Sequence, residues 1–229
     1  MAAIQRSGYD RLICLGDISG FSFPYYNFEE SRDAHGCLSL LREKSAIILP
    51  GNHDFHAMKR IPRESAVFAF PSDWYDLSYE QRAGLANNEI WLHEENDLRP
   101  GYTEEDIEYL QSLPEYQVLE TTGLNVLLSH YLYPNLSGVQ KGFYTMAFEL
   151  AAHFDFMQKH SCDLSISGHT HVRGFGLVSR KRFREYSYRK VRLRKFPLVL
   201  GIPPVTDNHK SSGFCIFDTD KLQVQAIRF

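Results

Sequence analysis

Four short apolar runs in the sequence each end in polar residues of the kinds that bind metals or transfer protons. The runs cover residues 12–15, 47–49, 126–128 and 164–166, and the polar residues that follow them are Asp17, Asn52, His53, Asp54, His130, His169 and His171. Apolar runs of this length that stop at Gly, Pro or Ser are typical of buried strands. Because ligands in open α/β sheets bind just beyond the carboxyl ends of the strands, the pattern predicts an α/β fold with its functional residues at strand ends.

These side chains have the chemistry of a metal site. Carboxylate oxygens and imidazole nitrogens suit Mn, Fe, Zn or Ni, and the amide of Asn52 offers a neutral oxygen. His53 can transfer a proton near neutral pH, and Asp54 beside it can hold the imidazole in orientation. A plain Asn/Asp turn is the alternative interpretation of residues 52–54, and the recurrence of the pattern at four strand ends argues against it.

The composition favours one globular domain. The chain has 229 residues and is 43% hydrophobic, enough for one sizeable core, so we expect a single domain over residues 1–229 with an inserted helical and loop region around 57–115. The net charge of −3 gives no global attraction to nucleic acid or membrane. The four scattered cysteines predict free thiols and a cytoplasmic location. No apolar run approaches the roughly 20 residues that span a bilayer.

One segment departs from this charge balance. Residues 180–195 are rich in Arg and Lys, and from Tyr188 on basic and apolar residues alternate as in a half-buried strand. A solvated hairpin is the simpler interpretation. Binding of a phosphate-rich partner such as nucleic acid is the alternative, since clustered Arg suits phosphate.

The remaining histidines are predicted to have structural places. His93, in the insertion, is interpreted as a surface or core residue without a metal-like partner. His153 falls on a predicted helix over residues 144–160 and is expected to be solvated. Asp33 and His35 lie two residues apart on a predicted helix over 29–44, so their side chains point to different faces and favour a solvated surface.

The blocks, in their order along the chain, resemble the calcineurin-like metallophosphoesterases, most nearly the small bacterial-type members. The blocks are Gly16-Asp17-Ile18-Ser19-Gly20, Gly51-Asn52-His53-Asp54, His130 after its apolar run, and Gly168-His169-Thr170-His171. The resemblance implies a four-layer sandwich of two mixed β-sheets flanked by helices. The Asp-x-His strand with which the family normally opens has no counterpart before Gly16-Asp17, so an N-terminal strand is expected to be missing.

The resemblance implies a metal-dependent phosphoester hydrolase, a phosphatase or phosphodiesterase, with two divalent ions. It implies Mn or Fe first, with Zn or Ni as alternatives. Asp17 would bridge the ions, Asn52, His130 and His169 would complete the second ion, and His171 would bind the first. Because only two ligands remain for the first ion, we expect the second site to be the better filled. His53 would contact the phosphoryl group as general acid, with Asp54 as an orienting residue.

A different class of function fits the same fold. Some relatives of these enzymes bind protein partners without catalysis, and the missing Asp-x-His favours such a scaffold. The retained His53, His130, His169 and His171 favour the enzyme, since a scaffold has little use for polar ligands at strand ends.

Overall fold

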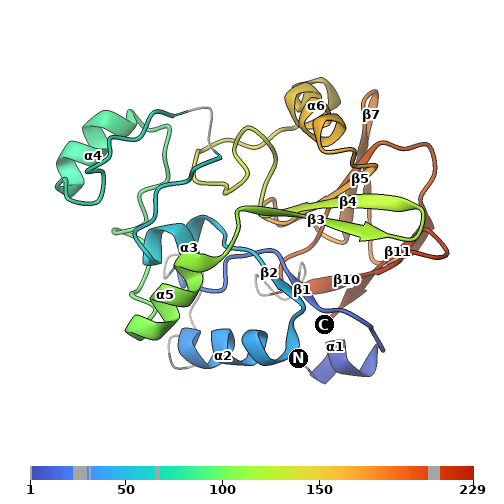
Figure 1. The fold of residues 1–229 in the computed structure, drawn as a ribbon, viewed down its shortest axis with the longest axis horizontal. Coiled ribbons are helices and arrows are strands. Elements are labelled where there is room, and N and C mark those ends of the chain that lie inside the picture. The colour runs from blue at the N-terminus through green and yellow to red at the C-terminus, as the bar shows by residue number, and fades with distance from the viewer. Residues whose placement is uncertain (1, 23–29, 31, 65–67, 206–211) are drawn as a thin grey trace. The chain divides into compact units, whose positions relative to one another are not determined.

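The computed structural model describes residues 2–22, 30, 32–64, 68–205 and 212–229, which form two compact units. The first unit comprises residues 1–11, 116–133 and 143–229, and the second comprises residues 12–115 and 134–142. Figure 1 shows their helices and strands by label.

A six-stranded mixed sheet forms the centre of the first unit. Its strands, in spatial order, are β3 (Tyr116–Thr121), β4 (Leu124–Ser129), β5 (Leu164–Ser167), β9 (Leu198–Gly201), β6 (Phe175–Ser179) and β7 (Arg182–Tyr186). The pairs β4–β5 and β5–β9 are parallel, and the other neighbours are antiparallel. The central strands β4, β5 and β9 are largely buried, as strands of a covered parallel sheet are.

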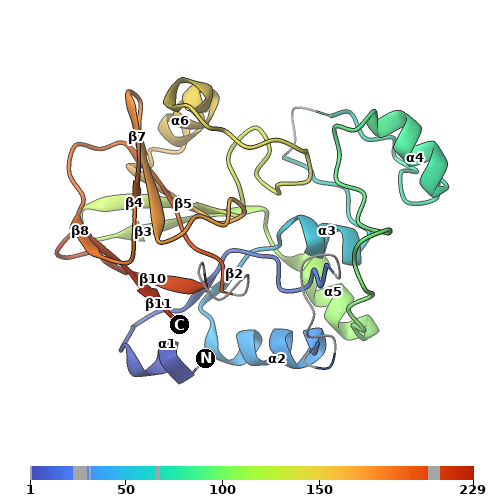
Figure 2. The ribbon, with the colours of Figure 1, turned by 180° about the vertical axis from the view of Figure 1, so that it is seen from behind.

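A three-stranded antiparallel sheet accompanies it in the same unit. It consists of β10 (Gly213–Asp218), β11 (Gln223–Arg228) and β8 (Lys190–Arg192), in that order, and is seen from behind in Figure 2. Two helices complete the unit, α1 (Ala2–Arg6) and α6 (Ala151–Lys159), the second preceded by a 3-10 turn over Ala147–Leu150.

The basic segment divides between the two sheets of this unit. Strand β7 lies at the edge of the large sheet with Arg182 and Arg184 exposed, and β8 lies at the edge of the small sheet with Lys190 and Arg192 exposed. Charged side chains on edge strands discourage pairing with another chain. The exposed charges agree with the predicted solvation of this segment, but β7 and β8 do not form a hairpin with each other: β7 pairs with β6, and β8 pairs with β11.

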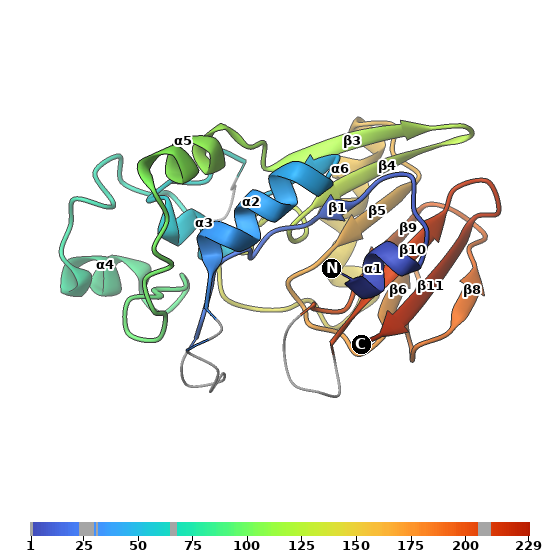
Figure 3. The same cartoon turned by 90° about the horizontal axis from the view of Figure 1, so that it is seen from below.

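Among its described residues, the second unit contains a short parallel strand pair and four α-helices. Strand β1 (Ile13–Cys14) pairs with β2 (Ile47–Ile48), and the helices are α2 (Ala34–Lys44), α3 (Asn52–Ala57), α4 (Tyr79–Ala86) and α5 (Glu104–Ser112). Figure 3 shows α2 beside β1. One buried cluster holds α2, β2, α3 and α5 together through Leu38, Ile48, Phe55, Met58, Leu110, Leu113 and Val139.

Residues of the segment 68–92 form a small core of their own. Trp74 is 2% exposed and packs edge-on against Phe68 and Phe70, with ring centroids 5.6 and 5.2 Å away. The backbone N–H of Trp91 donates to the Val139 carbonyl over 2.9 Å, which ties the insertion to residues 134–142. Trp74 is therefore a packing residue of this core.

The structure confirms the α/β class predicted from the strand ends. It contains one mixed six-stranded sheet, while the second sheet is antiparallel and β1–β2 pair separately.

The prediction of a solvated His153 was wrong. This residue is fully buried, and its ring nitrogens are satisfied by hydrogen bonds to groups of neighbouring elements. No helix among the described residues is both long and apolar enough to cross a membrane.

Candidate functional site

The Gly16-Asp17 block is shaped by a close approach of two loops in the second unit. A Cβ on Gly16 would lie 2.4 Å from the Gly51 nitrogen, and Gly16 has φ +99°, so only glycine fits. This contact sets the loop after β1 against the start of α3. The Asp17 carboxylate then accepts a hydrogen bond from the backbone N–H of His53 over 3.1 Å. The first two sequence blocks are thereby joined.

Asp54 fastens these same loops together. It is fully buried, and both burial and the neighbouring Asp17 raise the pKa of its carboxyl. Its oxygens accept hydrogen bonds of 2.9 to 3.2 Å from the backbone N–H groups of Gly51, Ser19 and Ile18 and from the Ser19 hydroxyl. These contacts make Asp54 a clamp between loops. They differ from the expectation that Asp54 orients the His53 ring.

The residue that holds the His53 ring is Asp97. Its carboxylate bonds to His53 Nδ1, and the two groups come from positions 44 residues apart in the chain. Gly20 makes room for the ring, since a Cβ there would lie 2.4 Å from His53 Cγ. The His53 side chain is 21% exposed and the Asp97 side chain 6% exposed, so the ion pair is largely shielded from water.

Carboxylates dominate the electrostatics around His53. Burial opposes the charged imidazolium, but Asp17, Asp97 and Asp54 outweigh it and raise the pKa of His53 to about 9. Burial likewise opposes ionisation of Asp97, but its hydrogen bond from His53 lowers the pKa of that carboxyl. The charged pair is therefore the stable form at neutral pH.

His93 is the second residue that the sequence interpretation missed. Its ring centroid lies 4.2 Å from that of His53, and its Nδ1 lies 3.5 Å from the Asp97 carboxylate. Burial, and then the positive charge of His53, lower the pKa of His93 to about 3. The expectation that His93 has no partner of this kind was wrong. A spacing of four residues between His93 and Asp97 was the only local signal, and it is common in proteins without a site.

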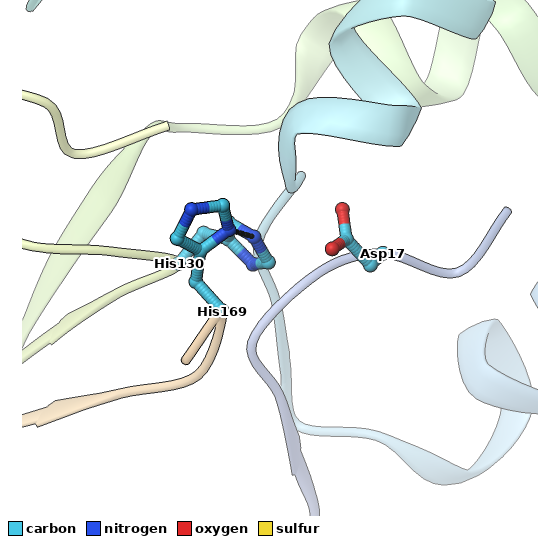
Figure 4. Close-up of side chains that lie close together, drawn as sticks. All are labelled: Asp17, His130 and His169. Atoms are coloured by element: carbon cyan, nitrogen blue, oxygen red, sulfur yellow. Dashed lines mark hydrogen bonds between the residues drawn. The ribbon is translucent and has the colours of Figure 1, made fainter. Parts of the chain in front are cut away.

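In the first unit, two adjacent parallel strands deliver His130 and His169. Ser129 at the end of β4 pairs with Ser167 at the end of β5, so the residues after them leave the sheet at the same edge. The Gly168 N–H donates to the His130 carbonyl over 2.9 Å, which continues the pairing beyond the strands. His130 Nε2 then lies 3.1 Å from His169 Nδ1 (Figure 4). Figure 4 also labels Asp17, which belongs to the other unit.

Three of the predicted ligands have a left-handed backbone. Asp17, His169 and His171 have φ of 55°, 64° and 49°. Non-glycine residues seldom adopt this conformation, which costs of order 1–3 kcal/mol and recurs at functional sites. His171 is exposed, two residues beyond His169. The strain marks both the Gly-Asp block and the Gly-His-Thr-His block as positions where side-chain direction matters.

The nitrogen pair of the first unit fits a metal ion. Two imidazole nitrogens bound at 2.0–2.1 Å to one tetrahedral or octahedral ion stand about 2.9–3.4 Å apart. The His130–His169 separation of 3.1 Å lies in that range. The two rings are therefore already at the spacing that a first-row metal would require.

Aromatic rings surround His169 on this unit. Tyr131 lies 4.6 Å and Phe143 lies 5.3 Å from its ring, centroid to centroid. Tyr131 is buried, and its hydroxyl accepts the N–H of Tyr144 over 2.9 Å. The rings restrict how far the His169 imidazole can turn.

Comparisons with known proteins agree with these features. A metallophosphoesterase from Sphaerobacter thermophilus aligns with a TM-score of 0.64 at 18% identity, over 100% of this chain and 81% of its own. The hypothetical protein PH1004 from Pyrococcus horikoshii OT3 aligns with a TM-score of 0.58 at 14% identity, over 99% and 78%. These likenesses support the fold.

A search among curated proteins found no match. The sequence profile described as calcineurin-like phosphoesterase matches residues 2–173, most of the chain and all of the blocks described above. The chain therefore belongs to the calcineurin-like phosphoesterase family.

Proposed function

We propose that this protein hydrolyses a phosphoester with the help of bound divalent metal ions. Family membership supplies the reaction class. The observation that carries the proposal for this chain is the His130–His169 pair, two ring nitrogens 3.1 Å apart at the ends of adjacent parallel strands. The two nitrogens hydrogen-bond to each other, which holds both rings at the spacing that a shared ion would require.

The proposed ligands follow the sequence blocks of the family. Asp17, Asn52, His130 and His169 are proposed for the better preserved ion, and Asp17 with His171 for the other. These ligands accept Mn, Fe, Zn or Ni, and we propose Mn or Fe. When bound, the ions would supply Lewis acidity to the phosphoryl oxygens and to a water.

His53 is proposed as the general acid. Hydrolysis joins a water oxygen to phosphorus and breaks the bond from phosphorus to the leaving oxygen. His53 would give its Nε2 proton to the leaving oxygen, and would recover a proton from the attacking water. Its Nδ1 stays bonded to Asp97 throughout. Asp54 contributes by keeping the loops of residues 16–20 and 51–54 together, which fixes where His53 stands.

The proposal is tested with the Mn-loaded protein and bis-p-nitrophenyl phosphate. Replacement His169→Asn removes an imidazole ligand, and Asn tolerates the left-handed backbone at that position. We expect loss of one bound Mn and a fall in kcat of at least about 100-fold. His160→Gln, at the end of α6, is the matched control and should retain both properties.

Other outcomes identify the alternative. Binding of Mn by the unchanged protein without turnover of either the diester or the p-nitrophenyl monoester would refute the enzyme and support a protein-binding scaffold.

The four cysteines are free thiols, which a reducing compartment preserves. We therefore propose a cytoplasmic location, to be checked by fractionation with a tagged protein.

A further inference from the structure

The segment 93–97 of the insertion is a fixed turn. The N–H groups of Asn96 and Asp97 donate to the His93 carbonyl over 3.1 and 2.8 Å. Asp97 also forms an antiparallel bridge with Ser22, and the Leu98 N–H donates to the Phe21 carbonyl over 3.1 Å. The turn is therefore attached to the chain just beyond Gly20. His93 and Asp97 are held on a firm backbone rather than on a mobile loop tip.

Both oxygens of the Asp97 carboxylate are engaged. Oδ1 accepts from the Ser22 hydroxyl, and Oδ2 accepts from His53 Nδ1. Two bonds in different directions prevent rotation of the carboxylate. The His53 ring, which bonds to it, is fixed in turn, and Nε2 is the nitrogen that remains for a substrate.

The contact between His93 and Asn52 fixes the direction of the Asn52 amide and the tautomer of the His93 ring. His93 Nε2 lies 3.2 Å from the amide nitrogen of Asn52, and both residues are buried. An amide nitrogen can only donate, so His93 Nε2 accepts and the ring carries its proton on Nδ1. That proton faces the Asp97 carboxylate. The Asn52 amide thus turns its nitrogen to His93.

We propose that His93 and Asp97 are positioning residues of the active site: Asp97 fixes the ring of His53, and His93 fixes the amide of Asn52. The inference rests on the proposed function, since it assigns these two targets the roles of general acid and metal ligand. The insertion around 57–115 would then be part of the active-site machinery. It supplies Asp97, which holds the proton donor His53, and His93, which holds the metal ligand Asn52.

The same atoms invite a different explanation. Ring nitrogens of His53 and His93 and an oxygen of Asp97 lie within 4.8 Å of one another and could hold a metal ion. Two contacts argue for hydrogen bonding instead. The Asp97 oxygens already accept from Ser22 and His53, and His93 Nδ1 carries a proton because Nε2 accepts from Asn52.

The first test compares leaving groups in Asp97→Asn. A general acid matters most when the leaving oxygen is strongly basic. We expect kcat to fall on the order of 10- to 100-fold for a dialkyl phosphodiester, whose leaving oxygen is strongly basic, and less for bis-p-nitrophenyl phosphate, with KM changing less than about twofold. Equal losses for both esters would overturn the role of Asp97. Glu95→Gln is the matched control, because it removes an exposed carboxylate two residues away.

The second test concerns metal affinity and His93. The variant His93→Phe cannot accept from Asn52, whereas His93→Gln can do so through its side-chain oxygen. We expect Mn to bind about 10-fold more weakly to the Phe variant and within about threefold of normal to the Gln variant. Equal affinity in all three proteins would overturn the role of His93.

A readout independent of activity separates this inference from the proposed function. Imidazole ¹H–¹⁵N spectra of the metal-free protein should show a far-downfield Nδ1 proton for His53 that disappears in Asp97→Asn, and the Nδ1-protonated form of His93. If the unchanged protein hydrolyses no ester but shows these signals, the hydrolase proposal fails and the positioning network stands. An additional bound Mn that is lost in Asp97→Asn would overturn the network in favour of a metal site.

Discussion

The burial of His153 predicts how the free energy of unfolding changes with pH. Its Nδ1 accepts the N–H of Tyr133 over 2.9 Å, and its Nε2 donates to the Ser165 hydroxyl over 2.9 Å. Because the backbone N–H can only donate, the ring must be neutral with its proton on Nε2. The side chain is fully buried, and burial lowers the pKa of His153 to about 3.

This shift makes the free energy of unfolding depend on pH in a defined direction. An unfolded histidine takes up a proton near pH 6.5. Between pH 6.5 and about 3 the unfolded chain therefore holds a proton at His153 that the folded chain does not. Stability must fall as the pH falls through this window, by up to about 1.4 kcal/mol per pH unit. From pH 6.5 to pH 5 the contribution is about 2 kcal/mol.

The assay is urea unfolding at pH 7, 6 and 5 of the unchanged protein and of His153→Gln. The Gln side chain can accept from Tyr133 and donate to Ser165, and it does not titrate. Subtracting the two pH profiles cancels every other group. We expect the unchanged protein to lose about 2 kcal/mol more than the variant between pH 7 and pH 5. A difference that stays constant across these pH values would refute a buried neutral His153.

Four further changes test separate features. Gly20→Ala should lower kcat at least about 10-fold, because the added Cβ would overlap the His53 ring; Gly84→Ala, in α4 with open space around the Cβ, should instead raise stability by about 0.5–1 kcal/mol in thermal unfolding. Thr103→Ala removes the hydroxyl that accepts the Asp106 N–H at the start of α5, and urea unfolding should show a loss of about 1 kcal/mol. Glu115→Ala removes the buried carboxylate that pairs with the partly buried Arg60, and should cost about 3 kcal/mol by the same measurement.

Local sequence signals predicted much of the fold. Thr103 and Asp106 form the capping pair that starts α5, and the predicted apolar runs became strands whose ends carry the polar blocks. Asp33 caps α2 by accepting the Gly36 N–H, and His35 pairs with Asp106 on the helix surface. The His35–Asp106 contact joins residues 71 positions apart, but the caps and the strands are each decided by a hydrogen bond or a periodicity within one short segment. The sequence contains such information directly.

The missed features depend on contacts between distant segments. His153 is buried because Ser165, on a neighbouring strand, offers its hydroxyl, and nothing in the helix itself predicts that. Asp97 meets His53 only because the insertion folds back on the loop at Ser22. Asp54 lies next to His53 in sequence, but on a helix adjacent side chains point in different directions. Its carboxylate meets Ser19 and Gly51 instead.

The left-handed backbone at Asp17, His169 and His171 has a practical consequence for mutagenesis. Alanine at these positions would remove a side chain and also impose a less tolerated conformation, so a single loss of activity would have two origins. Asparagine adopts this conformation more readily than other non-glycine residues. An asparagine scan of the three positions therefore reports on ligand chemistry, and a glycine scan reports on backbone relief. The difference between the two scans would measure the conformational free energy of the left-handed backbone that orients each ligand side chain.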